Sequence, residues 1–161
     1  MTVSQRVLCA AAVMFAAIGT GNAAELNTSA GGTVFESQCV VCHQAGATGM
    51  DGLAPPLTKM PAVFASSEAG RTHLLHTLLG GMVGPITVDG GSFNFKMPSF
   101  AALSDADIAN VANYLVFGID KAPASTKPIT ADAVAKARKT VLTPDDVYAE
   151  RGHVVGGDSQ K

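Results

Sequence analysis

The chain has 161 residues and a formal net charge of −2 at pH 7, and 15% of its residues are charged. Its 11 Lys and Arg residues are scattered along the sequence, which argues against the concentrated basic surface that nucleic-acid binding requires. The chain has no Trp and its apolar content comes mostly from small side chains, so the core is expected to gain from a large apolar filler.

The first 23 residues are typical of a secretory signal peptide. Arg6 provides a positive charge, residues 7–18 (VLCAAAVMFAAI) are an apolar stretch, and small residues follow. Cleavage after Ala23 leaves small residues at the recognised positions, whereas cleavage after Ala24 puts Asn22 at one of them. The alternative is an uncleaved membrane anchor, which needs about 20 apolar residues, more than this run contains. We therefore predict export to the periplasm, with no membrane span after signal removal.

A short helix is predicted over residues 33–44, around the sequence CVVCH. Removal of the signal peptide also removes Cys9, so Cys39 and Cys42 are the cysteines left in the mature chain. A disulfide across two residues closes too small a loop to stabilise a fold, so the pair is expected to have a chemical role. With His43 directly after it, the pair is compatible with zinc, with thiol-disulfide exchange or with a covalent haem.

A c-type haem fits this motif best. Two thiols three residues apart on a helix reach two substituents of one porphyrin edge, and the next residue, His43, points across the ring to the iron. A structural zinc site needs about four protein ligands, and neither a fourth Cys nor a His pair lies nearby. A thioredoxin-like site needs a βαβ context, which the flanking segments do not provide. We predict one covalent haem c on Cys39 and Cys42, with His43 as an iron ligand.

The middle of the chain is predicted to contain a loop, a helix and a hairpin. Residues 45–61 are dense in Gly and Pro and are typical of a loop. The helix begins after Ser67, carries an apolar stripe of leucines between positions 74 and 79, and ends at the glycines 80 and 81. Residues 86–95 alternate on both sides of Asp89-Gly90-Gly91, as in a small hairpin.

Residues 104–118 give the clearest helix prediction. Ser104 and Asp107 have the spacing of a capping box, and apolar residues recur at helical period as far as Gly118.

The character of the chain changes from residue 121 onward. Pro123 and Pro128 mark a linker, and two helices are predicted, one from Thr130 and one from Thr143-Pro144. Isolated helices this short are marginal in water, so they need a surface to pack on. That surface belongs either to the chain's own body or to a partner subunit, and both alternatives stay open. The chain thus divides into a signal peptide (1–23), a haem-binding domain (24–120) and a C-terminal extension (121–161).

The second axial ligand of the iron must come from elsewhere in the chain. The candidates after the signal peptide are Met50, Met60, Met82, Met97, His73, His76 and His153. Met97 is favoured because Pro98 stiffens the backbone beside it and because it lies far enough along the chain to reach the opposite haem face. The methionines at 50 and 60 are expected on the histidine side, and the histidines at 73 and 76 are expected to be ordinary helix residues.

This arrangement resembles class I cytochrome c over about residues 31–117. The resemblance rests on Gly31 and Phe35 ahead of CVVCH, a loop with APPL, the segment KMP, and a last helix carrying Tyr114 in NVANYL. It implies an all-α fold around one covalent haem, in which the first and last helices cross with these three residues at the contact. It also implies that a proline carbonyl, of Pro55 or Pro56, accepts a hydrogen bond from the ligating histidine.

A finer resemblance, to cytochrome domains that serve periplasmic dehydrogenases, rests on LAPPL, G-x-I-x-V-x-G-G and MPSF followed by LSDADIANVANYL. It implies one-electron transfer, either as a soluble carrier or as the cytochrome subunit of a dehydrogenase or oxidase complex. The expected partners are a dehydrogenase, a terminal oxidase or another cytochrome. With two axial ligands on the iron no catalytic site is expected. The alternatives are a peroxidase-like haem enzyme with a labile sixth ligand and a thiol-disulfide oxidoreductase.

Overall fold

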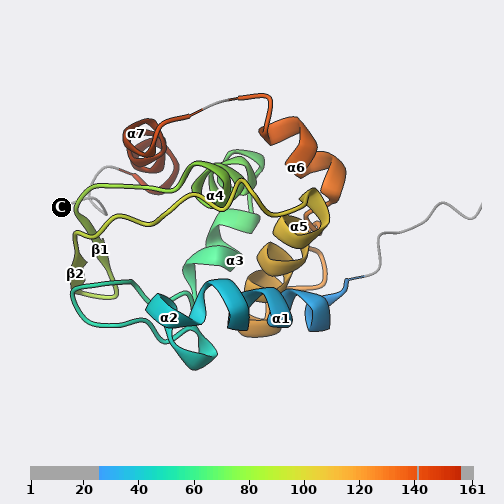
Figure 1. The fold of residues 1–161 in the computed structure, drawn as a ribbon, viewed down its shortest axis with the longest axis horizontal. Helices are drawn as coiled ribbons and strands as arrows, with labels where there is room; N and C mark the ends of the chain where they lie inside the picture. The colour runs from blue at the N-terminus through green and yellow to red at the C-terminus, as the bar shows by residue number, and fades with distance from the viewer. Residues whose placement is uncertain (1–25, 141, 157–161) are drawn as a thin grey trace, which may run out of the picture.

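The computed structural model describes residues 26–140 and 142–156 (Figure 1). The predicted signal peptide lies outside the described residues. Within the described ranges the fold is helical apart from one two-stranded hairpin, which confirms the predicted fold class. In chain order the elements before the hairpin are α1 (Thr28–Gln38), α2 (Val40–His43), the 3-10 turn η1 (Ala45–Ala47), α3 (Met60–Ala65) and α4 (Glu68–Gly80). After it come α5 (Asp105–Asn113), the π-helical segment η2 (Tyr114–Ile119), α6 (Ala131–Ala137) and α7 (Pro144–Val155).

Helix α1 begins five residues earlier than the sequence predicted. The side chain of Asn27 accepts a hydrogen bond from the backbone N–H of Ala30 at 2.9 Å, which caps the helix. The glycines at 31 and 32, which favoured a loop by composition, are inside the helix because its neighbour needs them there. A Cβ on Gly31 would lie 2.1 Å from the carbonyl oxygen of Asn110 in α5. The absence of that atom lets α1 and α5 cross in contact (Figure 1).

The crossing of α1 and α5 confirms what the resemblance implied for residues 31, 35 and 114. Phe35 is fully buried, and its ring centroid lies 5.6 Å from that of Tyr114. Helix α5 is capped by Ser104, whose hydroxyl oxygen accepts from the backbone N–H of Asp107 at 3.1 Å. The Asp107 carboxylate accepts from the Ser104 hydroxyl at 2.7 Å, so the reciprocal bond of a capping box is replaced by a bond between side chains.

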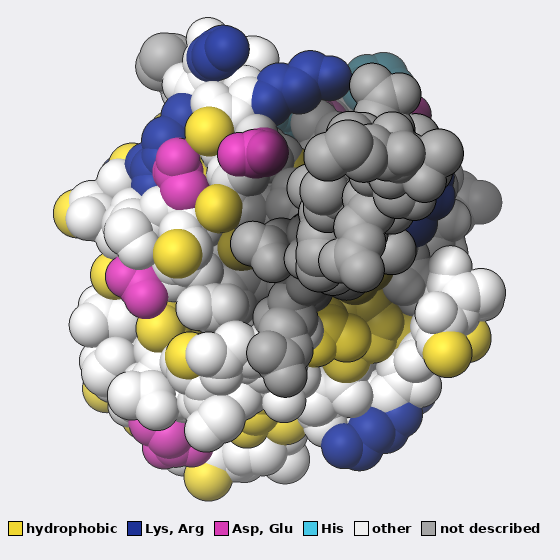
Figure 2. Space-filling model, turned by 90° about the vertical axis from the view of Figure 1, so that its right-hand side faces the viewer, with side chains coloured by type: hydrophobic (Ala, Val, Ile, Leu, Met, Phe, Trp, Pro, Cys, Tyr) yellow, Lys and Arg dark blue, Asp and Glu magenta, His cyan; other side chains and the backbone are white. Residues whose placement is uncertain are grey.

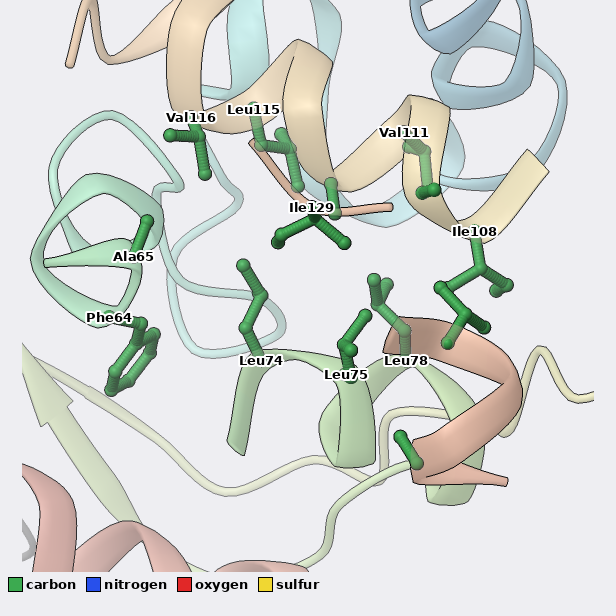
Figure 3. Packing of buried hydrophobic residues seen from close by; sticks show 14 of the residues in the cluster. Phe64, Ala65, Leu74, Leu75, Leu78, Ile108, Val111, Leu115, Val116 and Ile129 are labelled. Carbon is green, nitrogen blue, oxygen red and sulfur yellow. The ribbon is translucent and has the colours of Figure 1, made fainter. Parts of the chain in front are cut away.

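The core lies between α4 on one side and α5 with η2 on the other. Leu74, Leu75 and Leu78 of α4 face Val111 and Leu115 across this layer, as Figure 3 shows. Burying each of these side chains stabilises the fold by about 1.5–3 kcal/mol relative to exposure. Helix α4 has the predicted caps, since the Ser67 hydroxyl accepts from Gly70 and Gly81 follows with φ 74°. The short helix α3, with Pro61 in its first turn, was not predicted.

The predicted hairpin is present as β1 (Ile86–Val88) and β2 (Gly91–Phe93), which pair antiparallel with Ile86 opposite Phe93. Asp89 and Gly90 form the turn, with φ of 50° and 81°. Both angles suit a two-residue hairpin loop, and Asp and Gly tolerate them.

The C-terminal extension packs on the chain's own body. Helix α6 lies against α5, and α7 lies against α4. Val134 and Val147 are fully buried in these contacts. The linker before α6 is held by Asn113, whose amide donates to the Ile129 carbonyl at 2.8 Å and accepts from the Ile129 N–H at 2.9 Å. Of the two alternatives for the extension, the structure therefore favours a folded-back segment.

The surface shows no concentration of one charge on the face drawn in Figure 2, where basic and acidic side chains are interspersed. None of the helices within residues 26–140 and 142–156 is long and apolar enough to cross a membrane.

Candidate functional site

A pocket with mostly apolar walls lies between the CVVCH segment and the body of the protein. Its walls come from α2, the loop at 53–57, the start of α3, one face of α4, the hairpin, residues 95–100 and α7. Segments from the start, middle and end of the chain therefore build one site. Apolar walls of this extent suit a large apolar group, which is what the Ala-rich core was expected to need.

Cys39 and Cys42 both line this pocket. Cys39 separates α1 from α2, and its carbonyl accepts from the N–H of His43 at 2.9 Å, so the motif forms one helical turn. Burial, and to a lesser extent the neighbouring Cys42, raises the pKa of the Cys39 thiol from 9.0 to about 11. A thiol of that pKa supplies little thiolate at neutral pH and is therefore a poor group for thiol-disulfide exchange.

His43 is oriented by the loop that follows it. Its Nδ1 lies 2.9 Å from the Pro55 carbonyl oxygen, and because a carbonyl only accepts, Nδ1 carries the proton and donates. The lone pair is then on Nε2, the nitrogen available to a metal. Burial lowers the pKa of His43, and the bond to Pro55 opposes this, so the ring is held neutral. Of the two prolines left open by the sequence, Pro55 provides this carbonyl, whereas Pro56 contributes to the pocket wall.

Three of the four candidate methionines reach the pocket: Met60, Met82 and Met97. Met50 is 40% exposed and is not among the residues that line the pocket. Met82 and Met97 are neighbours on adjacent segments, since each backbone N–H donates to the other's carbonyl, at 3.2 and 2.9 Å. The segment after Met97 is fixed to the end of α4 by a bond from the N–H of Phe100 to the Leu78 carbonyl at 2.9 Å.

Arg151, in the C-terminal extension, is a pocket residue that the sequence did not indicate. It is 4% exposed, and its guanidinium carbon lies 5.4 Å from the centroid of the Phe64 ring. Its Nε is buried with no hydrogen-bond partner in the described part of the chain. Burial lowers the pKa of this guanidinium, with Tyr148 acting in the opposite direction. A buried cation with an unused donor fits a pocket whose occupant carries an acidic group.

The histidines at 73 and 76, expected to be ordinary helix residues, are buried and bound to Glu150 of α7. His153 is exposed and does not line the pocket. The described residues thus fit haem c by four features: two thiols in one turn, a neutral imidazole, thioethers in the same cavity and a buried cation.

Comparison with known proteins agrees with this geometry. The family model Cytochrome c matches residues 28–116. The chain is 41% identical to cytochrome c-552 of Thermus thermophilus over 124 residues, which are 76% of this chain and 95% of that protein. A cytochrome c-552 from another strain of that organism is equally similar, with 84% of its length covered. The cytochrome c subunit of a quinone alcohol dehydrogenase from Gluconobacter oxydans is 27% identical over 113 residues, 70% of this chain and 22% of that subunit.

The family match spans the motif, the crossing of α1 and α5 and the segment with Met97. Members of the family bind haem c covalently through a C-x-x-C-H motif, which residues 39–43 fit, and they transfer electrons. The chain belongs to the cytochrome c family, and its cofactor is an iron-containing haem c.

Proposed function

We propose that this protein is a periplasmic one-electron carrier, or the electron-transfer subunit of an oxidoreductase complex, with His43 and Met97 as the axial ligands of its haem. The observation that carries the proposal is the His43–Pro55 bond, because it leaves Nε2 unprotonated in a pocket that also contains Met97. Haem c, when bound, supplies an iron that accepts and releases one electron.

The chain's own residues have distinct roles in this proposal. Cys39 and Cys42 hold the group covalently, and Pro55 fixes the tautomer and orientation of His43. A thioether ligand and an apolar pocket both favour the reduced state, so the potential is expected to be positive. The Arg151 guanidinium accounts for an acidic substituent at the pocket wall.

Two axial ligands leave no position on the iron for a substrate, which argues against the peroxidase-like alternative. The raised pKa of Cys39 argues against the thiol-disulfide alternative.

Partner proteins are expected to meet the molecule at the rim of the pocket. Val41 and Phe95 line the pocket and are 75% and 61% exposed, which is unusual for large apolar side chains. A redox protein that covers this rim is the proposed donor or acceptor. A dehydrogenase fits this role, because one similar protein is named as a cytochrome c subunit of a quinone alcohol dehydrogenase. The proposed location follows from the predicted signal peptide.

The test is to express the full chain in a bacterial host that attaches haem in its periplasm. Covalent haem is detected by staining after denaturing electrophoresis, and ligation is detected by the thioether-to-iron band of the oxidised protein. Met97→Ala is expected to keep the covalent haem and lose the band. Met82→Leu and Met60→Leu are matched controls at the same pocket and are expected to keep it.

Loss of the band in Met82→Leu or Met60→Leu instead would show that Met97 is not the ligand. A wild-type protein that carries no covalent haem would overturn the proposed function as a whole.

A further inference from the structure

A buried cluster of three titratable side chains joins α4 to the C-terminal helix α7. The Nδ1 atom of His73 lies 3.0 Å from Oε2 of Glu150, and the Nδ1 atom of His76 lies 2.9 Å from Oε1 of the same carboxylate. The two histidines are 1% and 7% exposed, and the Glu150 side chain is 27% exposed. We call these three residues the His-Glu-His cluster. Their ring nitrogens are occupied with Glu150, and no group of three metal-ligating side chains in the described ranges is arranged to hold a metal ion.

The cluster lies between the haem pocket and a second hollow. His73 lines the haem pocket, and its Nε2 lies 3.4 Å from the hydroxyl of Thr77, which lines the same pocket. His76 lines the other hollow, which is formed by α4, the linker before α6 and α6 itself. Glu150 bridges the two rings, so the cluster connects the hollow to the haem pocket through two hydrogen bonds.

The protonation states follow from the partners. An ionised carboxylate only accepts, so both Nδ1 atoms carry protons and both Nε2 atoms are free to bind one more. Burial lowers the pKa of His73, with Glu150 opposing this and with Arg151 and His76 adding to it, which favours neutral His73 in the protein as described. With neutral rings the cluster has one negative charge, and one further proton makes it neutral.

The charged groups around the cluster come from several elements. Arg151 of α7 approaches from the haem pocket, and the second hollow is lined by Glu68 and Arg71 of α4, Lys127 of the linker and Lys136 of α6. From α3 only the Phe64 ring touches it, edge-on to His73 at 5.0 Å between centroids. These neighbours keep fixed charges near neutral pH, so the cluster is the group beside the pocket whose charge can change.

We propose that the His-Glu-His cluster takes up one proton when the protein accepts an electron, and that the proton enters through the hollow beside His76. The inference rests on the proposed electron-transfer function. In the balanced step, a donor protein loses one electron, the haem site gains it, and one proton passes from water to the cluster. The net charge of the buried region is then unchanged. On oxidation by the acceptor, the electron and the proton leave together.

The physical reason is the low dielectric of the interior. A negative charge added to the pocket attracts a proton to the nearest basic site more strongly there than in water. The affinity of the cluster for a proton is therefore higher in the reduced protein, and by linkage the midpoint potential falls as the pH rises. The rings and the carboxylate titrate as one coupled unit, so a single macroscopic step is expected for the cluster.

The experiment compares midpoint potential against pH for the wild-type holoprotein and the double variant His73→Asn, His76→Asn. Asn keeps an amide N–H near the position of Nδ1 and does not titrate. We expect the proton affinity of the wild-type cluster to differ at least threefold between the two redox states, which equals about 28 mV in a one-electron potential. The double variant is expected to lose this part of the pH dependence. His153→Asn, at an exposed position of α7, is the matched control and is expected to keep it.

An NMR titration of the wild-type histidines in both redox states provides a test that needs no variant. The resonances of His73 or His76 are expected to titrate at higher pH in the reduced protein, whereas those of His153 are not. Glu150→Gln provides a second variant if the double variant fails to fold. Equal titration in the two redox states, or an unchanged pH dependence in the folded variants, would overturn the inference and would leave the cluster as a structural link between α4 and α7. Because each readout requires bound haem, a protein without haem would contradict the proposed function before this inference is reached.

Discussion

Asp120 is a carboxylate in a place that disfavours its charge. One oxygen, Oδ2, accepts from the N–H of Ala62 at the start of α3, at 2.8 Å, while Oδ1 is buried with no partner in the described part of the chain. Burial raises the pKa of Asp120 from 3.8 to about 6, and the Ala62 bond opposes the shift. A raised carboxyl pKa means that the folded state binds the proton more tightly than the unfolded state does. Its contribution to stability is therefore complete below pH 3.8 and is lost as the pH rises through about 6.

The substitution Asp120→Asn tests this at the level of one side chain. Asn keeps an oxygen that accepts from Ala62 and cannot ionise, so its free energy of unfolding is expected to gain on that of the wild type as the pH rises from about 4 to about 7. We expect a gain of about 1 kcal/mol, since the side chain is partly exposed and solvent screens its charge. Urea unfolding at a series of pH values measures it. Asp51→Asn, in an exposed loop, is the control, and an identical pH profile for Asp120→Asn and wild type would contradict the expectation.

At the scale of elements, the contact between α1 and α5 depends on one missing methyl group. Gly31→Ala places a Cβ 2.1 Å from the Asn110 carbonyl oxygen and 2.7 Å from Cβ of Tyr114, and neither is the far end of a flexible chain. The two helices must therefore separate, which is expected to lower the free energy of unfolding by about 3 kcal/mol. Thermal unfolding of the holoprotein provides the measurement.

Gly32→Ala is the matched control for this prediction. The new Cβ meets the Tyr114 ring at 3.3 Å, where a small movement of the side chain makes room, and Ala is favoured over Gly in a helix by about 1 kcal/mol. Its stability is expected to equal or exceed that of the wild type. If the two variants were equally destabilised, helix composition, and not the crossing, would be responsible.

The elements that the sequence predicted well are those whose determinants are local. Ser67 and Gly81 bound α4, and Asp89-Gly90 turns the hairpin, because caps and turns are decided within four residues. Helix α1 was started too late, because the reason for Gly31 lies in α5, about 80 residues away in the sequence.

The same limit applies to the site. The motif at 39–43 specifies its own chemistry, and the structure places Met97 in the same pocket, where its role as ligand is still a prediction. The choice of Pro55 over Pro56 depends on the path of a loop and not on composition. Arg151 and Glu150 are adjacent residues with ordinary helical spacing in α7, and only tertiary packing shows that one faces the haem pocket while the other binds two histidines of α4.

For the molecule as a whole, the extension is expected to contribute to stability. A chain truncated after Ala122 loses the packing of Ile129, Val134 and Val147, all almost fully buried, and each such side chain is worth about 1.5–3 kcal/mol. We predict a marked fall in the melting temperature of the holoprotein. Truncation after Gly156 removes only residues outside the described ranges and is the control. An unchanged melting temperature combined with loss of binding to a redox partner would instead identify the extension as a docking arm.

The position of Tyr148 has a consequence for biosynthesis. Its hydroxyl donates to the Pro85 carbonyl at 2.8 Å and its ring packs on Gly84, so α7 reaches the segment that precedes the hairpin as well as α4. The helix that completes this wall is encoded within the last 20 residues, whereas the thiols that receive the haem are at positions 39 and 42. During synthesis and export the thiols therefore emerge about 100 residues before the wall opposite them exists. The open side gives the attachment machinery access, and arrival of the C-terminal helix then closes the pocket over a haem that is already in place.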